Sequence, residues 1–471
     1  IKKELESMSM NTSLEDLKNR KDFRKHITFT IDPIDAKDFD DALSLKVSPS
    51  GIIKIGIHIA DVGHYIPVNS EIDKEAFLRA FSVYFPGQVI PMIPEKLSNE
   101  ICSLNPEEDK LCFSVVVEFE KHTHKIKSTW IGKTIINSNK RFTYEEAENI
   151  IIGKCDSIFE NEIQMINNIA QKLRGKRIKD GSIDFERHNI SFKLNKYQEP
   201  IEIVQSESLA AHKLVEEFML LANKIVAQKL SNKKSAIYRV HDSPDKDKIQ
   251  DISNYLTQLK VKNTNLNIEH QKLPKIINSL LKDPKLKHSR AIIENLILRA
   301  MAKAHYSTKN IGHYGLGFKK YTHFTSPIRR YSDLIVHRLV YAVLYDKKIN
   351  LLDLEKKCQH FSKTEKNYVD LERKINKFVQ LKLLENSIGN TFNGIITGVV
   401  KWGIYVDIDG YRGEGLVPIK ELTDDNYYYN SLLHSFVGRK SGRKYILGQK
   451  LIVKIKSINL FNQEMDLKII N

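Results

Sequence analysis

Four aspartates that could bind metal ions stand close together near the start of the chain. Residues 30–42 read TIDPIDAKDFDDA and contain Asp32, Asp38, Asp40 and Asp41. Two carboxylates about 4 Å apart repel by roughly 4 kcal/mol at an effective dielectric constant of about 20, so a site that gathers several must protonate some or bind cations. Oxygen ligands favour Mg²⁺ or Mn²⁺ over zinc. The stretch therefore predicts a divalent-cation site, and two ions about 4 Å apart are suited to phosphodiester hydrolysis.

Two less specific interpretations of this stretch remain open. An acidic loop in solvent is common, and the number of carboxylates alone does not separate it from a metal site. A calcium-binding EF-hand loop needs Gly at its sixth position and Glu at its twelfth, where this chain has Lys37 and Leu43. The apolar runs at 27–34 and 42–45 favour a site inside the fold over a solvated loop.

A second motif, HYGLGFKKYTHFTSPIRRYSDLIVHRLV, occupies residues 313–340. Ser326 is a favourable N-cap and Pro327 a favourable first helical residue, so we predict a helix that holds Arg329 and Arg330 in its first turn. Cations at that end oppose the helix dipole unless an anion docks on the free N–H groups. The motif thus predicts a phosphate site, and an exposed, solvated arginine pair is the alternative.

The overall composition limits the function classes. The chain has 471 residues and a net charge of +16, with 41% hydrophobic and 28% charged residues. This composition is typical of a soluble globular protein of two or three domains. The basic excess favours a polyanion partner, although a general preference for lysine explains it as well. Four cysteines without a metal-binding spacing argue against zinc and favour a reducing compartment, and no apolar run is long enough to span a membrane.

The elements that must position these residues are both strands and helices. The sequence predicts strands at 53–65, 111–119, 129–136 and 237–241, and helices at 208–230, 247–306, 327 onward and 353–386. A helix is also expected to open at Tyr144, and prolines between residues 82 and 106 exclude a long helix there. From Gly389 onward, short strands and turns predict a small antiparallel barrel. The expected fold class is α+β, followed by an all-β domain.

The aspartate spacing in TIDPIDAKDFDDA resembles the signature of the RNase II/RNase R family, the RNB-domain exoribonucleases. The helix HKLVEEFMLLAN and the second motif resemble the family in the same order, and residues 389–417 resemble an S1-type OB fold. The resemblance implies Mg²⁺-dependent hydrolysis of single-stranded RNA from its 3′ end to nucleoside 5′-monophosphates. Mn²⁺ in place of Mg²⁺, and degradation of structured RNA with a 3′ overhang, stay open. Family members usually carry N-terminal cold-shock modules, and we expect none in this sequence.

The resemblance also implies roles for individual residues. Asp32, Asp40 and Asp41 would bind the ions, with Asp38 in or beside the same shell, and Arg329 would grip the RNA where it is cut. The residues expected to contact RNA in the catalytic domain are Tyr84, Tyr144, Phe185, Tyr321, Thr325, Ser326, Arg329, Arg330 and Glu372. The residues expected to form a base-stacking platform on the barrel are Phe392, Trp402 and Tyr405.

These inferences give a domain plan and a function. We expect a lead-in or linker at 1–24, an RNB catalytic domain with a mixed sheet flanked by helices around an RNA channel at 25–386, and an S1-type OB fold at 387–471. The expected protein is a monomeric, cytoplasmic 3′–5′ exoribonuclease that binds RNA and no membrane. A non-catalytic RNA-binding protein and an endonuclease with the same ions are the rival hypotheses.

Overall fold

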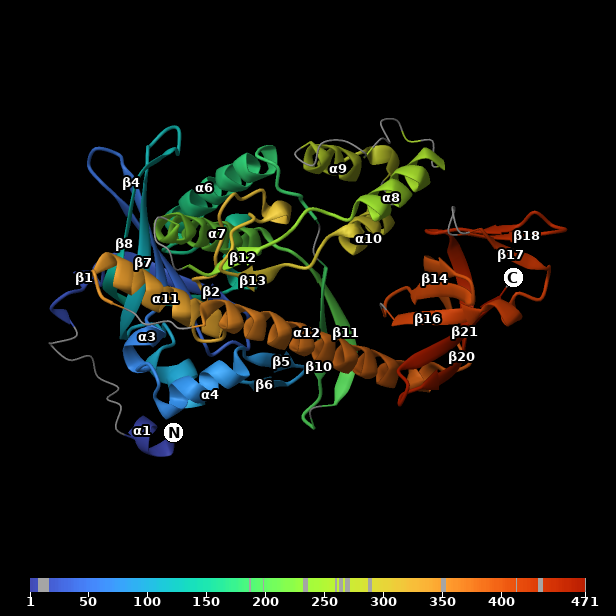
Figure 1. Cartoon of the computed structure of the whole chain (residues 1–471), viewed down its shortest axis with the longest axis horizontal. Coiled ribbons are helices and arrows are strands. Elements are labelled where there is room, and N and C mark those ends of the chain that lie inside the picture. Colours follow the sequence, from blue (N-terminus) through green and yellow to red (C-terminus); the bar gives the residue numbers. More distant parts are fainter. Residues whose placement is uncertain are drawn as a thin grey trace.

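The computed structural model describes residues 1–6, 17–185, 188–197, 199–231, 236–258, 261, 266, 272–286, 290–348, 353–411, 413–430 and 435–470. Figure 1 shows a larger body of sheet and helices and a smaller all-β body, which are joined by the long helix α12 (Leu354–Leu384). Among the described helices, none is both long and apolar enough to cross a membrane.

A seven-stranded mixed sheet is the centre of the larger body. Its strands, in spatial order, are β1 (Lys21–Asp22), β8 (Ile126–Asn137), β7 (Asp109–Phe119), β4 (Ile53–Ala60), β3 (Asp41–Val47), β2 (Ile27–Asp32) and β9 (Lys140–Thr143). The β1–β8 and β2–β9 pairs are parallel, and the other pairs are antiparallel. The apolar run IKIGIHIA of β4 is buried along almost its whole length, as expected for a central strand that is covered on both faces.

The predicted lead-in at 1–24 lies only partly within the described residues, because 7–16 are outside them. Its first part forms the short helix α1 (Lys2–Glu6). Its last part joins the sheet, where Lys21 pairs with Thr134 of β8 and Phe23 is buried in the core. The sheet therefore begins before residue 25.

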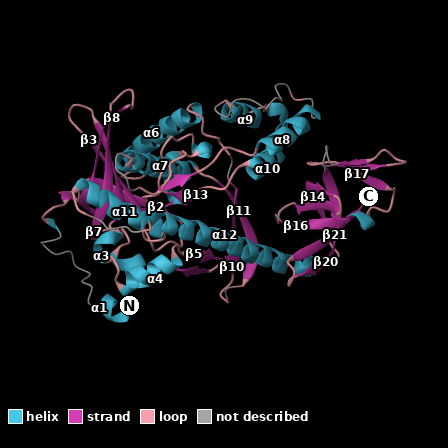
Figure 2. Cartoon of the chain, viewed as in Figure 1, coloured by secondary structure: helices cyan, strands magenta, loops and turns pink. Residues whose placement is uncertain are grey.

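Helices pack on the sheet and complete the main core. The helices that contribute most to it are α5 (Tyr144–Ile151), α6 (Glu160–Lys179), α7 (Ala210–Leu230) and α11 (Tyr331–Leu344). Phe218 of α7 and Ile57 of β4 belong to the same buried cluster. Figure 2 shows α6, α7 and α11 beside the strands of the sheet. The helices predicted at 208–230 and 353–386, and the helix that opens at Tyr144, are confirmed.

The remaining elements connect these layers. Between β4 and β7 lie α3 (Val62–Tyr65), α4 (Glu71–Arg79), β5 (Val83–Phe85), β6 (Gln88–Ile90) and a helical turn at Lys96–Ile101. The strands β10 (His188–Leu194) and β11 (Pro200–Glu207) form a hairpin, and β12 (Tyr238–Val240) pairs with β13 (His305–Ser307). The helical lobe consists of α8 (Lys246–Gln258), α9 (Leu273–Leu281) and α10 (Arg290–Ala300). The four predicted strands are present, and the described parts of 247–306 are mostly helical.

The predicted start of helix α11 is wrong. Arg330 is extended, with φ −138° and ψ 117°, and the helix begins at Tyr331. Arg330 is extended because it forms a β-bridge with Phe81, and Tyr331 N donates to Ala80 O at 2.8 Å. Arg329 and Arg330 thus precede the helix and do not lie in its first turn.

The smaller body is a closed barrel, as the sequence predicted, but one of its strand pairs is parallel where the prediction was antiparallel. Its strands, in spatial order, are β14 (Thr391–Val400), β15 (Gly403–Ile408), β16 (Gly413–Pro418), β21 (Glu464–Ile470) and β20 (Lys450–Asn459). A separate small sheet contains β17 (Tyr427–Asn430), β18 (Ser435–Gly438) and β19 (Lys444–Tyr445). Closure removes the free edges of the barrel and confirms the OB-type architecture. The barrel contacts the helical lobe where Tyr255 OH donates to Leu447 O at 3.5 Å.

Candidate active site

The acidic loop, residues 33–40, connects β2 to β3 and is held at both ends and in its middle. Asp32 ends β2 and Asp41 begins β3, so the two strands fix the backbone of two of the four aspartates. Within the loop, Phe39 N donates to Ser103 Oγ at 3.0 Å. The apolar runs seen in the sequence are therefore the two strands that carry the loop.

Asp40 joins the two motifs that the sequence singled out. Its side chain is buried, and its Oδ1 accepts a hydrogen bond from Ile328 N at 2.9 Å. Its Oδ2 lies 3.4 Å from Arg329 Nε and accepts no hydrogen bond. Residues that are 288 positions apart in the chain are thus in direct contact. The acidic loop and the arginine motif form one site.

The aspartates are buried with too little positive charge nearby to neutralise them. Burial raises the pKa of Asp40 well above its usual range, although Arg329 and the N–H of Ile328 act in the opposite direction. Burial and the charge of Asp41 raise the pKa of Asp32 to about 8, and burial raises the pKa of Asp41 to about 6. The Oδ2 atom of Asp32 is also buried without a hydrogen-bond partner. A divalent cation would neutralise these carboxylates, and their unpartnered oxygens would bind it as ligands.

The donor atoms suit Mg²⁺ or Mn²⁺, because every candidate ligand is a carboxylate oxygen. Within the described residues, no group of three or more His, Cys, Asp or Glu side chains is arranged so that it could hold one metal ion. Asp38 instead accepts a hydrogen bond from Tyr84 OH at 3.0 Å, and Asp40 faces Arg329. Tyr84 thus engages one oxygen of Asp38 and Ile328 engages one oxygen of Asp40, which leaves the second oxygen of each carboxylate for an ion.

Asp38, Tyr84 and Glu372 form a chain of contacts beside the acidic loop. Tyr84 OH donates to Asp38, and Tyr84 N donates to Glu372 Oε1 at 3.4 Å. Tyr84 belongs to β5 and Glu372 to α12. The structure thus brings two predicted RNA-contacting residues to the aspartates, and their contact with each other has no signal in the sequence.

Arg329 and Arg330 point in different directions. The side chain of Arg329 is 44% exposed, contacts Asp40, and donates from Nη2 to Ser326 Oγ at 2.9 Å. Arg330 turns inward and donates from Nη2 to Asp333 Oδ2 at 2.7 Å. The two guanidinium groups do not converge, and it is Arg329 that presents its charge to the acidic site.

Tyr144 lies beside the aspartates at the start of α5. Its ring stacks on His212, with 3.9 Å between centroids and 13° between planes. Burial raises the pKa of Tyr144, and the charges of Asp41 and Asp32 raise it further. The structure therefore brings this predicted RNA-contacting residue to the acidic site.

Tyr321, Thr325 and Ser326 are buried in the stretch that leads to Arg329. Asn223 of α7 donates from Nδ2 to Tyr321 OH at 3.2 Å and to Thr325 Oγ1 at 3.5 Å. These hydrogen bonds hold the stretch against α7. Tyr321 and Thr325 thus fix the position of this stretch, and Ser326 accepts a hydrogen bond from Arg329.

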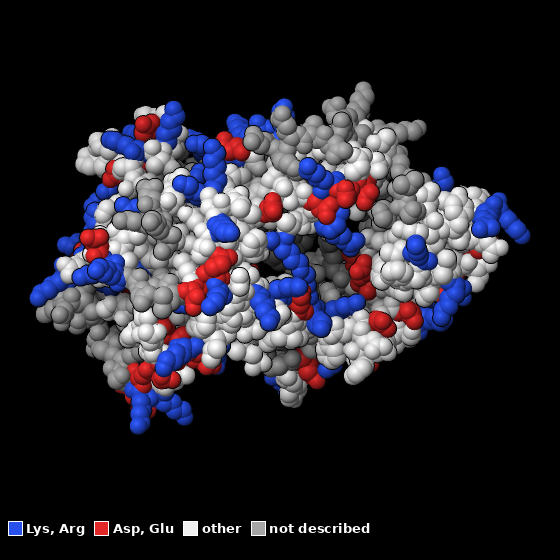
Figure 3. Space-filling model, viewed as in Figure 1, with Lys and Arg blue, Asp and Glu red and all other residues white. Residues whose placement is uncertain are grey.

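Phe185 lies in a pocket of about 560 Å³ between α6, α7 and the helical lobe. Charged side chains that line it include Arg174, Lys213, Glu216 and Arg290. Figure 3 shows that the molecule is hollowed near the middle of this face, with Lys and Arg side chains along the edge. Arg174, Lys213 and Arg290 come from three different helices, so their convergence on one pocket had no local signal in the sequence.

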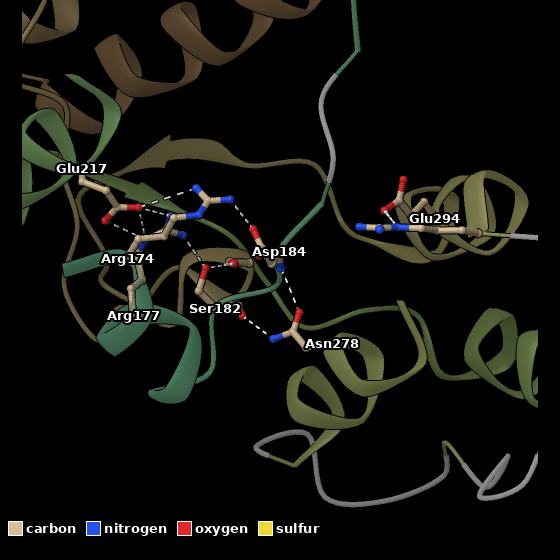
Figure 4. Close-up of polar contacts among 9 residues, drawn as sticks. Arg174, Arg177, Ser182, Asp184, Glu217, Asn278 and Glu294 are labelled. Carbon is tan, nitrogen blue, oxygen red and sulfur yellow. Dashed lines mark hydrogen bonds and ion pairs between the residues drawn. The ribbon is translucent and has the colours of Figure 1, made fainter. Parts of the chain in front are cut away.

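Polar contacts hold the segment before Phe185 to the helical lobe (Figure 4). Asn278 of α9 donates from Nδ2 to Ser182 O at 2.8 Å, and Asp184 N donates to Asn278 Oδ1 at 2.9 Å. Arg174 forms an ion pair with Asp184. The position of Phe185 therefore depends on residues from α6 and α9 that sequence analysis did not single out.

The barrel aromatics do not share one face. Trp402 is 59% exposed in the turn between β14 and β15, and its Nε1 donates to Tyr405 OH at 3.4 Å. Phe392 pairs across β14 and β20 with Val453, which lies in the barrel core, and contacts Tyr411 at 5.7 Å between ring centroids. Paired residues point to the same side of a sheet. The structure therefore brings Trp402 and Tyr405 together and turns Phe392 inward.

Family comparisons agree with this geometry. The RNB domain family matches residues 20–346, and the S1 RNA binding domain family matches residues 385–470. The first match alone covers well over half of the chain. This chain belongs to the RNB-domain family, with an S1 domain after the RNB domain, and its relatives within that family are ribonuclease R proteins.

Two bacterial relatives match almost the whole chain. Ribonuclease R from Aquifex aeolicus (strain VF5) is 38% identical over 467 residues, which are 97% of this chain and 66% of the relative. Ribonuclease R from Thermotoga maritima is 36% identical over 467 residues, which are 96% of this chain and 65% of the relative. The chain thus spans just under two thirds of the length of these relatives.

Solved structures share the fold. Mycoplasma genitalium RNase R in complex with ribose methylated single-stranded RNA has a TM-score of 0.92 at 30% identity, over 99% of this chain and 74% of that chain. The same protein in complex with double-stranded RNA has a TM-score of 0.85 at 29% identity, over 100% of this chain and 80% of that chain. Yeast Ssd1, a pseudonuclease, has a TM-score of 0.73 at 20% identity, over 95% of this chain and 54% of that chain. The fold alone therefore does not establish catalysis, which depends on the residues at the site.

Proposed function

We propose that this chain is a 3′–5′ exoribonuclease of the ribonuclease R type, which hydrolyses single-stranded RNA to nucleoside 5′-monophosphates with the help of divalent cations. The observation that carries the proposal is the position of Asp40, which contacts both Arg329 and the N–H of Ile328. Unpartnered carboxylate oxygens beside a half-exposed guanidinium can receive a phosphodiester together with the cations that accompany it.

Each group at the site has a distinct part in this proposal. Asp32, Asp38, Asp40 and Asp41 would hold Mg²⁺, with Mn²⁺ as the alternative ion. When bound, such ions activate a water molecule and offset charge on the departing oxygen. Arg329 adds a positive charge that stabilises the negative charge developing on the phosphate during cleavage.

RNA contact is supported by the position of the aromatic residues. Tyr84 and Tyr144 lie beside the aspartates, and Phe185 lies in the separate pocket, so a stack of bases between them would present the 3′ end to the site. Trp402 and Tyr405 offer a further stacking surface. The Mycoplasma relative binds single-stranded RNA in one structure and double-stranded RNA in another, which supports RNA as the partner and structured RNA as a further substrate.

The domain plan and cellular setting belong to the same proposal. The division between a catalytic domain that ends near 386 and an S1 domain at 387–471 is supported by the family matches at 20–346 and 385–470, whereas the lead-in ends before residue 24, because β1 already belongs to the sheet. All four cysteines are free thiols, which supports a reducing compartment such as the cytoplasm. A monomer is supported by the apolar cores that the chain closes by itself.

A comparison of linear and circular RNA tests the proposal. Both RNAs have the same sequence and are incubated with the chain in Mg²⁺ or in EDTA. We expect the linear RNA to shorten from its 3′ end and to release nucleoside 5′-monophosphates in Mg²⁺, while the circle stays intact and EDTA stops the reaction.

Two results would contradict the proposal. Cleavage of the circle would identify an endonuclease. Binding of linear RNA without any cleavage in Mg²⁺ or Mn²⁺ would identify a non-catalytic RNA-binding protein.

A further inference from the structure

Residues 80–84, here named the crossing segment, touch the arginine motif through their backbone. Tyr331 N donates to Ala80 O at 2.8 Å, and Ser82 N donates to Arg329 O at 3.0 Å. These bonds are the reason that Arg329 stands outside α11. They fix the backbone of the proposed phosphate-binding residue against the crossing segment.

Tyr84, at the end of the crossing segment, reaches the acidic loop and α12. Its hydroxyl donates to Asp38 Oδ2 at 3.0 Å, and its N–H donates to Glu372 Oε1 at 3.4 Å. Arg329, Asp38 and α12 are therefore all bonded to five consecutive residues. A shift of this segment would move the arginine and the carboxylate relative to each other.

The outer strand of the hairpin that carries Tyr84 has little packing of its own, although Val83 of β5 is buried. Strands β5 and β6 form a separate two-stranded sheet, and Val89 and Ile90 of β6 are 47% and 42% exposed. A two-stranded hairpin is at best marginally stable by itself. Its contacts with Asp38 and Glu372 therefore help to set its position relative to the acidic loop.

We propose that the hydroxyl of Tyr84 positions Asp38 for metal binding, a role separate from the base stacking that the proposed function gives to its ring. This inference rests on the proposed function and makes the hydroxyl a positioning group. Because the hydroxyl bonds Oδ2, it limits rotation of the Asp38 side chain and leaves Oδ1 available to an ion. Hydrogen bonds to metal-ligating carboxylates orient them in this way at many metal sites.

The phenol of Tyr84 is the donor in this contact, because a carboxylate oxygen can only accept. Tyr84 as a whole is 40% exposed, which leaves its ring accessible to a base.

Tyr84→Phe separates the two roles, because it keeps the ring and removes the hydroxyl. Binding of Mn²⁺ and of Mg²⁺ to the RNA-free chain is measured by calorimetry, and RNA affinity is measured in EDTA. We expect Tyr84→Phe to weaken ion binding about tenfold, the lower end of what loss of an outer contact costs a metal site. RNA affinity in EDTA should stay within about twofold of wild type, because stacking needs only the ring.

Two further variants define the comparison. Tyr84→Ala removes ring and hydroxyl together and should weaken both ion binding and RNA binding. Tyr345→Phe is the matched control, because Tyr345 is an exposed tyrosine that packs on Tyr341. It should bind ions and RNA as the wild type does.

The outcomes distinguish this inference from the proposed function. If Tyr84→Phe binds ions as tightly as wild type, the hydroxyl has no positioning role, while the proposed function stands because the wild-type chain still binds ions and cleaves RNA. If the wild-type chain binds no ion, both fall together. Raised Mg²⁺ should restore cleavage by Tyr84→Phe; a rate that stays low at all Mg²⁺ concentrations would also overturn the inference.

Discussion

Asp40 and Asp61 are two buried aspartates in neighbouring parts of the sheet with different surroundings. Asp40 comes directly before β3, and Asp61 comes directly after β4, which pairs with β3. The side chains are 4% and 0% exposed. Asp61 forms ion pairs with Arg20, at 2.7 Å from Nη2, and with Lys133. Asp40 faces the single, half-exposed guanidinium of Arg329.

This comparison shows that nearby cations decide whether burial raises the pKa of a carboxylate or is overcome. Burial acts to raise the pKa of Asp61, yet Lys133 and Arg20 hold it well below its usual range. Burial raises the pKa of Asp40, and Arg329 does not reverse the effect. A paired buried aspartate contributes to the fold, whereas an incompletely neutralised one is suited to bind an ion from solution.

The largest expected effect is on catalysis at Asp40. Asp40→Asn keeps the shape of the side chain and removes its charge, so we expect RNA cleavage to slow about a thousandfold or more. RNA affinity should persist, because most contacts with RNA lie elsewhere. Release of mononucleotides from a labelled single strand measures the rate.

Asp35→Asn is the control for this variant, since Asp35 is exposed in the same loop. It should cleave RNA at the wild-type rate. Cleavage by Asp40→Asn at a rate near that of the control would show that Asp40 has no role in catalysis.

The second effect is on stability at Asp61. Asp61→Asn removes the buried carboxylate that pairs with both Arg20 and Lys133, so the free energy of unfolding should fall by about 3–5 kcal/mol. Urea unfolding measures the change. Asp22→Asn, in an exposed pair with Arg24, should cost less than about 1 kcal/mol. Equal losses of unfolding free energy in the two variants would show that the buried ion pairs of Asp61 stabilise the fold no more than an exposed pair does.

The third effect is a stabilisation of the fold by metal. An ion that binds only the folded chain adds about 2.7 kcal/mol at 100 times its Kd. The midpoint temperature of thermal unfolding of the wild type should therefore be higher in Mg²⁺ than in EDTA. The increase should be much smaller for Asp40→Asn. An equal rise in both proteins would place the ion at another site.

The smallest effect is the dependence of stability on pH at Asp61. The unfolded chain protonates an aspartate near pH 3.9, whereas the folded chain keeps Asp61 charged to lower pH. The unfolded state thus binds more protons below about pH 4, and the stability that Asp61 contributes is present above that pH and is lost as the pH falls. The stability difference between wild type and Asp61→Asn should shrink below about pH 4. A difference that stays constant at lower pH would contradict the assignment.

The acidic site could be predicted because its residues are adjacent in the chain. Asp32, Asp38, Asp40 and Asp41 stand in one loop between two apolar strands, and both the loop and the strands leave a local pattern. The family resemblance placed Arg329 near them. No local pattern, however, indicates that the N–H of Ile328 bonds to Asp40.

Contacts between distant segments explain most of what the sequence did not predict. Arg330 is held outside α11 by its bridge to Phe81, a residue about 250 positions away on the crossing segment. Asp61 and Lys133 are 72 positions apart, and a lone aspartate after a strand carries no sign of a buried ion pair. Such pairs are set by tertiary packing and not by propensity.

The inward position of Phe392 has a particular cause. Side chains alternate between the two faces of a regular strand, so the buried position of Val399 would predict that Phe392 points outward. Strand β14 has an irregular register between Ile396 and Gly398, which reverses the alternation in the part before it. Ile396, three positions from Val399, is buried as well. A bulge of this kind is not visible in the sequence pattern.

Helix α12 gives the molecule a fixed internal length. Its 31 residues extend roughly 46 Å, and Glu372, beside Tyr84, lies roughly 18 Å along the axis from the end at Leu384 that leads to the barrel. On the proposed function, the aspartates and the barrel would contact different parts of a bound RNA. The release of the last remnant of a degraded strand and the grip on a long substrate would then be governed by separate surfaces.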